Sequence, residues 1–248
     1  MKFLFSILRL FSPEIAHSIS LNGLKIVHNF GLINFFASKN THLDSYTLNN
    51  LTFTNRLGIA AGLDKNGDFI DSLGALGFGF IEVGTVTPLA QDGNPKPRIF
   101  RVFKENAIIN RLGFNNKGVD YLVKKLESRK YKGVVGVNIG ANKESKGDKR
   151  IADYVECFKK VYVLSDYITI NISSPNTPDL RDLHSEENIY NLLKSLDIQR
   201  QSFNTKKPVF LKISPDESLE TLQIILDAVR EFNISGLILS NTTIDKSL

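Results

Sequence analysis

Asparagine, lysine, serine and threonine side chains recur where short apolar segments of the sequence end. Six such ends occur, at Ala61-Gly62-Leu63-Asp64-Lys65, Gly84-Thr85-Val86-Thr87-Pro88, Asn138-Ile139-Gly140, Asn171 to Pro178, Lys212-Ile213-Ser214-Pro215 and Ser240-Asn241-Thr242-Thr243. The amides among them, with Asn110, offer both donors and acceptors and suit a neutral ring with amide edges. Lys65 and Lys212 suit an anionic group or the electron-rich edge of a reduced cofactor. One polar strand end would mean little because loops are polar, but six in succession favour a binding site.

Several other kinds of site lack support in the sequence. His, Cys and carboxylate residues do not cluster at metal-ligand spacing, so we expect no metal site. Neither a GxGxxG motif nor a P-loop motif follows an apolar segment, so neither phosphate-binding fold is indicated. The net charge of +5 comes without a long Lys/Arg run, so we expect no nucleic-acid partner. Cys157 is the single cysteine, which allows no internal disulfide.

The elements that position the polar ends alternate between strand-like and helix-like patterns. Strands are predicted within residues 57–61, 80–83, 134–137, 167–170, 209–211 and 237–239, helical stripes within 69–76, 119–126 and 219–229, and hairpins around Asn49-Asn50 and within 98–110. Short buried strands that alternate with amphipathic helices predict a parallel sheet covered by helices. The 248 residues fit an α/β fold of the TIM (β/α)8-barrel type, in which active sites lie at the carboxyl ends of the strands. About six βα units are predicted, whereas a closed barrel needs eight.

Residues 1–40 differ from the rest because they are rich in Phe, Leu and Ile. A first helix is expected to end near Phe11, and a second to begin with Ser12 as N-cap and Pro13 at its first position. Two interpretations of this segment stay open. It forms a helical pair that packs on the barrel, or it presents an apolar face to a membrane surface or to an apolar ligand. We therefore divide the chain into this helical segment and a barrel of residues 41–248.

Five segments resemble the motifs of the dihydroorotate dehydrogenase family. They are Ala60-Ala61-Gly62-Leu63-Asp64-Lys65, Gly84-Thr85-Val86-Thr87-Pro88, Asn110-Arg111-Leu112-Gly113-Phe114-Asn115-Asn116, Asn171 to Pro178 and Ser240-Asn241-Thr242-Thr243. The resemblance extends from about Ser12 to Leu248 and so covers nearly the whole chain. It implies an FMN enzyme of de novo pyrimidine (UMP) biosynthesis that oxidises (S)-dihydroorotate to orotate.

The resemblance also implies catalytic roles. Ser174 resembles the base that removes the C5 proton while hydride moves from C6 to flavin N5, and Thr177 resembles its proton-relay partner. Family members with a soluble electron acceptor carry Cys at this position, whereas membrane-linked members carry Ser. The serine and the apolar segment 1–40 together imply the quinone-dependent class (class 2), with His17 and Arg101 as the polar pair at the quinone head. Such an enzyme is expected to be a monomer bound peripherally to the cytoplasmic side of the cell membrane.

Binding roles carry over residue by residue. Contacts to dihydroorotate and orotate are expected from Lys65, Asn110, Arg111, Leu112, Gly113, Phe114, Asn171, Asn176, Asn241 and Thr242. Contacts to FMN are expected from Ala61, Gly62, Leu63, Asp64, Lys65, Thr85, Asn138, Asn171, Lys212 and Ser240. Ser240 departs from the family pattern, in which Thr is frequent at this position, but either hydroxyl suits the role.

Two competing interpretations stay open at this point. In the family, two further βα units carry the Gly-rich loops that hold the FMN phosphate, and they are not found in residues 1–248. In the first interpretation, the chain is therefore an inactive truncated fragment of such an enzyme that is unable to hold FMN. Another FMN barrel enzyme is the other alternative, and the motif from Asn171 to Pro178 argues against it.

Overall fold

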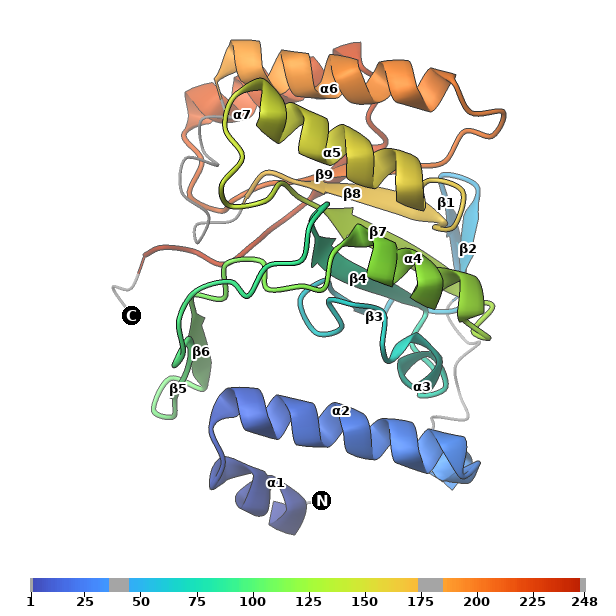
Figure 1. Cartoon of the computed structure of the whole chain (residues 1–248), viewed down its shortest axis with the longest axis vertical. Coiled ribbons are helices and arrows are strands. Elements are labelled where there is room, and N and C mark those ends of the chain that lie inside the picture. The colour runs from blue at the N-terminus through green and yellow to red at the C-terminus, as the bar shows by residue number, and fades with distance from the viewer. Residues whose placement is uncertain (1, 36–44, 174–184, 246–248) are drawn as a thin grey trace.

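Six parallel strands form the central sheet of the computed structural model, which describes residues 2–35, 45–173 and 185–245 (Figure 1). In sheet order they are β3 (Gly58–Ile59), β4 (Phe80–Val86), β7 (Val134–Ile139), β8 (Tyr167–Asn171), β9 (Val209–Lys212) and β10 (Gly236–Ile238). Each of these strands pairs with the next one along the chain, which is the connectivity of a β/α barrel. The prediction of an α/β fold with about six barrel units is confirmed.

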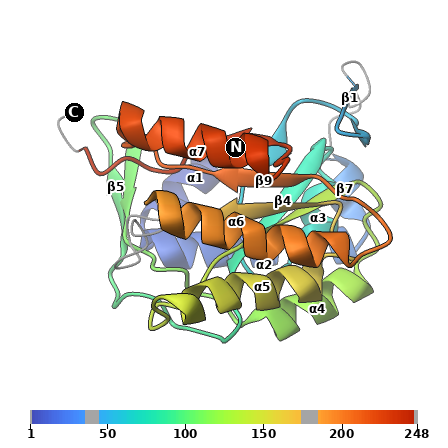
Figure 2. The ribbon, with the colours of Figure 1, turned by 90° about the horizontal axis from the view of Figure 1, so that it is seen from above.

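A layer of helices covers the outer face of the sheet. It consists of α3 (Ile70–Gly74), α4 (Val119–Ser128), α5 (Asp148–Val161), α6 (Glu186–Gln201) and α7 (Leu219–Glu231). Figure 2 shows α4, α5, α6 and α7 following one another around the strands, and each contacts the next. Because the helices bury one face of the sheet and side chains fill the other, every residue of β7 and β8 is buried.

The sequence of α5 shows why these helices form and where they pack. Tyr154, Cys157, Phe158 and Val161 are spaced by three and four residues, lie on one face of the helix and are fully buried. The Tyr154 hydroxyl also donates a hydrogen bond to the Asn171 carbonyl at 2.7 Å, which ties the helix to the end of β8.

Two hairpins flank the sheet, as predicted. β1 (Tyr46–Leu48) and β2 (Leu51–Phe53) are joined by Asn49 and Asn50, whose φ angles of 49° and 63° are those of a tight hairpin turn. Phe53 packs beneath the sheet against Val134 and Tyr167. The second hairpin consists of β5 (Ile99–Val102) and β6 (Ala107–Asn110).

The N-terminal segment contains α1 (Lys2–Arg9), α2 (Pro13–Asn29) and the short 3-10 helix η1 (Leu32–Phe35). As predicted, α2 starts at Pro13 with Ser12 at the N-cap position. The Ser12 side chain makes no capping hydrogen bond, and its carbonyl accepts from Ala16 N. Arg98 forms a 2.6 Å ion pair with Glu14, which ties α2 to the start of β5. None of the described helices combines the length and the apolar character needed to span a membrane.

The two edge strands generate a prediction about self-association. Among the described residues β10 pairs with β9 alone and β3 with β4 alone, so each leaves one backbone edge unpaired. We expect a polypeptide of residues 1–248 on its own to self-associate, because such edges pair with other chains. Gel filtration with light scattering measures this.

Leu239→Lys, beside β10, should reduce the association by placing a charge at the edge, because Leu239 is 76% exposed. The matched control is Leu219→Lys on α7, where the leucine is 86% exposed, and it should leave the association unchanged. A monodisperse monomer of the unmodified polypeptide would contradict the prediction.

Candidate active site

The carboxyl ends of β4, β7 and β8 bring three polar side chains into one buried cluster. Thr85 Oγ1 donates a hydrogen bond to Asn138 Oδ1 at 2.6 Å. Asn171 Nδ2 donates to Thr85 Oγ1 at 3.0 Å and to Asn138 Oδ1 at 3.2 Å. We call these three residues the strand-end cluster. Sequence analysis expected all three as cofactor contacts, and the structure places them together.

The cluster extends through Ser173 to the last strand end. Asn171 Oδ1 accepts hydrogen bonds from Ser173 Oγ at 2.8 Å and from Ser173 N at 3.1 Å. Asn241 Nδ2 donates to Ser173 Oγ at 3.0 Å, and Asn241 Oδ1 accepts from Thr242 N. Ser173 was missed by sequence analysis, although its position between Asn171 and Ser174 was a signal. Ser240, by contrast, is exposed and donates to the Asn241 carbonyl.

Three of the predicted site residues fall outside the described part of the chain. They are Ser174, Asn176 and Thr177. Their roles therefore stay predictions. The described chain ends at Ser173 on one side of this gap, and Ser173 is 4% exposed.

A carboxylate lies beneath the strand-end cluster. Glu82, on β4, is 5% exposed and accepts hydrogen bonds from Asn138 Nδ2 at 2.9 Å, Thr169 Oγ1 at 2.9 Å and the Tyr167 hydroxyl at 3.0 Å. Burial and the neighbouring Glu82 raise the pKa of Tyr167 well above its usual value, so its hydroxyl stays a donor. Sequence analysis gave Glu82 no role, because it stands within an apolar strand segment.

Two lysines supply positive charge near the strand ends. Lys212 ends β9 opposite Asn171 and is 9% exposed, and its ammonium group makes neither a hydrogen bond nor an ion pair with the described residues. Lys65 is partly buried, and its ammonium donates to the Gly62 carbonyl at 3.0 Å. Burial, and then repulsion by Arg98, lowers the pKa of Lys65 to about 8.

The loop after β3 is held against β4. Gly62 N donates to the Gly84 carbonyl at 2.8 Å, and Gly84 N donates to the Asp64 carbonyl at 3.2 Å. Gly62 has a φ of +109°, and a Cβ built on it would meet no heavy atom within 4 Å, so open space adjoins the backbone of Gly62. The carboxylate of Asp64 accepts from the backbone N–H groups of Asp68 and Phe69, and burial raises its pKa. The Asp64 side chain therefore stabilises the loop. The carbonyls of Asp64 and Leu63 also have partners within the protein, in Gly84 N and His17, and Ala61 is half-buried.

The segment after β6 places the aromatic ring of Phe114 near the strand-end cluster. Phe114 is 8% exposed, and a Cβ built on Gly140 would lie 3.1 Å from its ring and 2.8 Å from Thr85 Cγ2, so the ring lies near the strand-end cluster. Arg111 donates to the Pro97 carbonyl at 2.9 Å and so turns towards the hairpin. The Leu112 and Gly113 carbonyls accept from Asn94 N and Gln91 Nε2, respectively, and Asn110 is half-buried at the end of β6.

His17 and Arg101, expected as a pair, bind different backbone groups. His17 Nε2 lies 2.8 Å from the Leu63 carbonyl, in hydrogen-bonding contact with the loop after β3. Arg101 Nη1 donates to the Phe11 carbonyl at 2.8 Å and to the Arg9 carbonyl at 3.4 Å, so it satisfies carbonyl groups at the end of α1. Both residues thus connect the N-terminal segment to the barrel.

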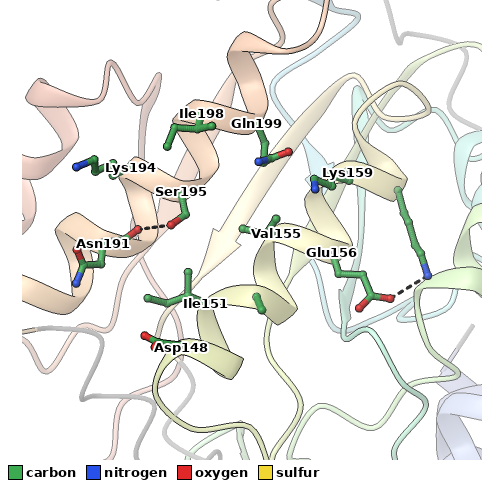
Figure 3. Close-up of a pocket in the computed structure, with 12 residues that line it drawn as sticks. Asp148, Ile151, Val155, Glu156, Lys159, Asn191, Lys194, Ser195, Ile198 and Gln199 are labelled. Carbon is green, nitrogen blue, oxygen red and sulfur yellow. Dashed lines mark hydrogen bonds and ion pairs between the residues drawn. The ribbon is translucent and has the colours of Figure 1, made fainter.

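A groove of about 950 Å³ lies on the outer surface between α5 and α6 (Figure 3). Ile151 and Val155 line it from α5, and Lys194 and Ile198 line it from α6. None of the expected site residues contributes to it. Its side chains come from helices that cover the sheet, so the groove is separate from the strand-end cluster.

Known proteins resemble this chain both in sequence and in fold. A family model described as dihydroorotate dehydrogenase matches residues 44–248. The dihydroorotate dehydrogenase (quinone) of Saccharophagus degradans is 48% identical over 237 residues, which cover 94% of this chain and 70% of that protein. That of Coxiella burnetii (strain Dugway 5J108-111) is 48% identical and covers 93% of this chain and 67% of that protein. A crystal structure of ligand-free DHODH from Eimeria tenella superimposes with a TM-score of 0.84 at 34% identity, covering 94% of this chain and 70% of that chain.

The lowered pKa of Lys65 generates a prediction about pH. The ammonium is charged below its pKa of about 8 and neutral above it, so attraction for a carboxylate ligand is lost as the pH rises through this value. We expect the affinity for orotate, used as a carboxylate probe, to fall about tenfold from roughly pH 7 to roughly pH 9.5. Isothermal titration calorimetry measures this.

Lys65→Met should bind orotate more weakly at neutral pH and should show no such decline. Lys132→Met, which replaces an exposed lysine, is the matched control and should behave as the unmodified protein does. An affinity that stays constant across this range in the unmodified protein would show that Lys65 does not bind the carboxylate.

Proposed function

The chain belongs to the dihydroorotate dehydrogenase family, and from this premise we propose that it oxidises (S)-dihydroorotate to orotate in pyrimidine biosynthesis, with FMN and then a quinone as electron acceptors. The observation that carries the proposal is the strand-end cluster of Thr85, Asn138 and Asn171, which lies within the matched region. Its amide and hydroxyl groups suit the amide edges of a flavin ring and of orotate.

The residues around the cluster fit FMN. Open space adjoins Gly62, which leaves room for a flat ring beside the backbone. Lys212 holds a buried ammonium group that is free of described partners and suits the negative charge of a reduced flavin at its N1/O2 edge. When bound, FMN would accept the hydride from C6 of dihydroorotate. Thr85, Asn138 and Asn171 would hold the ring through hydrogen bonds.

Substrate binding draws on residues from several strand ends. The Lys65 ammonium suits the carboxylate of dihydroorotate. Asn171 and Asn241, which are joined through Ser173, suit the amide edges of its ring. Asn110, Asn176 and Thr242 complete this set by resemblance to the family.

Ser174 would take the C5 proton, with Thr177 as the relay. A serine hydroxyl is a weak base at neutral pH and needs both a relay and a site that excludes water. The single thiol is unsuited to the role, because Cys157 is fully buried in α5 and burial raises its pKa well above the usual value. A serine base is typical of the quinone-dependent class.

The N-terminal segment would bring the quinone from the membrane. Its exposed apolar side chains include Leu10, Phe30 and Phe35, which are 84%, 76% and 83% exposed. An apolar surface of this kind binds to the interface of a bilayer. His17 links α2 to the loop after β3, so the segment reaches the region where FMN would bind. By resemblance to the family, an enzyme whose barrel is closed, and whose edge strands are therefore paired, would act as a monomer bound peripherally at the cytoplasmic side of the membrane.

The proposed base is tested by Ser174→Ala in the FMN-loaded protein. Flavin bleaching by dihydroorotate should slow by at least about a hundredfold, because the C5 proton loses its acceptor. Orotate affinity should change by less than about threefold, since the amides bind the ring in ground and transition states alike. Stopped-flow absorbance measures bleaching and spectral titration measures affinity. Ser195→Ala, on the exposed side of α6, is the control, and near-normal bleaching by Ser174→Ala would rule out Ser174 as the base.

The proposed membrane surface is tested by replacing Leu10 and Phe30 together with serine. Binding to anionic lipid vesicles should weaken by about tenfold or more, because two large apolar side chains no longer enter the bilayer. Reoxidation of the flavin by a long-tailed quinone should slow, whereas bleaching by dihydroorotate should not.

Leu219→Ser replaces an equally exposed leucine on α7 and serves as the matched control. Vesicle sedimentation and stopped-flow reoxidation are the measurements. Unchanged vesicle binding in the double variant would place the membrane surface elsewhere. Reoxidation by fumarate as fast as by quinone would contradict the quinone-dependent assignment.

A further inference from the structure

Glu82 is a buried carboxylate whose contacts are all hydrogen-bond donors. Asn138 Nδ2 reaches one carboxylate oxygen, and the hydroxyls of Tyr167 and Thr169 reach the other. An ionised carboxylate only accepts hydrogen bonds, and a buried one needs several donors to offset its lost hydration. Gly136, which lies opposite Glu82, leaves room for the Tyr167 ring that donates to this carboxylate, because a Cβ there would meet the ring at 2.0 Å.

This arrangement determines which way the Asn138 amide faces. Its nitrogen must point to Glu82, because its oxygen would repel the carboxylate. Its oxygen therefore points to the strand ends, where Thr85 Oγ1 and Asn171 Nδ2 both donate to it. Once Asn171 donates through its nitrogen, its own oxygen accepts from Ser173. One acid beneath the cluster thus sets the direction of each hydrogen bond above it.

We propose that Glu82 is a positioning residue, which fixes the hydrogen-bond direction of Thr85, Asn138 and Asn171 and so decides which donors and acceptors this cluster presents to a flavin. The inference rests on the proposed function in one respect, namely that the cluster holds FMN. The alternative is an acid that only fills space and supports packing. In that case any loss of a hydrogen bond to Glu82 would have a similar effect.

The two accounts are separated by Glu82→Gln and Tyr167→Phe. Glutamine keeps the shape of Glu82, but its amide offers Asn138 a nitrogen as readily as an oxygen, so the Asn138 amide is no longer held in one orientation. Tyr167→Phe removes one donor from the same carboxylate and leaves its charge and its contact with Asn138 in place. Glu82→Asp, which keeps the charge but withdraws it from Asn138, should act as Glu82→Gln does and replaces it if the glutamine variant does not fold.

The first measurement needs no cofactor. It follows the side-chain amide signals of Asn138 by NMR in the full chain, assigned by their loss in Asn138→Asp. In the unmodified protein we expect one pair of Asn138 amide proton signals. The amide proton that is hydrogen-bonded to the Glu82 carboxylate should be shifted downfield. Glu82→Gln should lose this shift or show two orientations, whereas Tyr167→Phe should retain it.

The second measurement is the FMN dissociation constant, from quenching of flavin fluorescence. Glu82→Gln should raise it by about tenfold, the factor for one charge-assisted hydrogen bond, and Tyr167→Phe by less than about twofold. Native Asn138 signals in Glu82→Gln, or equal effects of the two variants, would overturn the proposal. An unmodified protein that binds FMN but is not bleached by dihydroorotate would instead refute the proposed function and leave the NMR result valid.

Discussion

Parallel pairing in a fixed register is the constraint on which the rest of the molecule depends. Gly84 lies opposite Asn138, Asn138 opposite Thr169, and Asn171 opposite Lys212. Because side chains alternate between the two faces of a sheet, a slip of one residue would turn each polar group from the interior to the helical layer. Hydrogen bonds of buried polar groups within the strands resist such a slip, because Asn138 and Thr169 both donate to Glu82 and would lose this partner. The chemistry at the strand ends is thus positioned by contacts further down the strands.

The N-terminal segment is held in place by its contacts with the barrel rather than by a hydrophobic core of its own. Glu14 of α2 forms an ion pair with Arg98 of the barrel, and the Arg98 side chain is only 6% exposed. Leu21 joins the main core from α2. The same segment contacts the loop after β3 through His17, so the apolar surface and the strand-end cluster are joined by a short path of polar contacts. The N-terminal segment and the strand-end cluster are therefore mechanically connected.

The sequence predicted those features that follow from local pattern. The strands within 134–137 and 167–170 were recognisable because strands buried on both faces are apolar throughout. The Asn49-Asn50 turn was recognisable because asparagine tolerates positive φ. Glu82 was not, because a lone acid in a strand gives no sign that donors from two other strands surround it. The structure also shows what motif matching leaves open, namely that the Asp64 side chain serves its own loop.

The burial of Cys157 has a practical consequence. Its side chain is inaccessible within α5, and a thiol that stays protonated is a poor nucleophile. In the folded protein, Cys157 is therefore expected not to react with maleimide and methanethiosulfonate reagents. A single cysteine introduced on the exposed surface would carry a fluorophore or a spin label at one defined place, with no need to remove the natural cysteine first. Labels at exposed N-terminal positions would then report by spectroscopy whether each side chain contacts a bilayer.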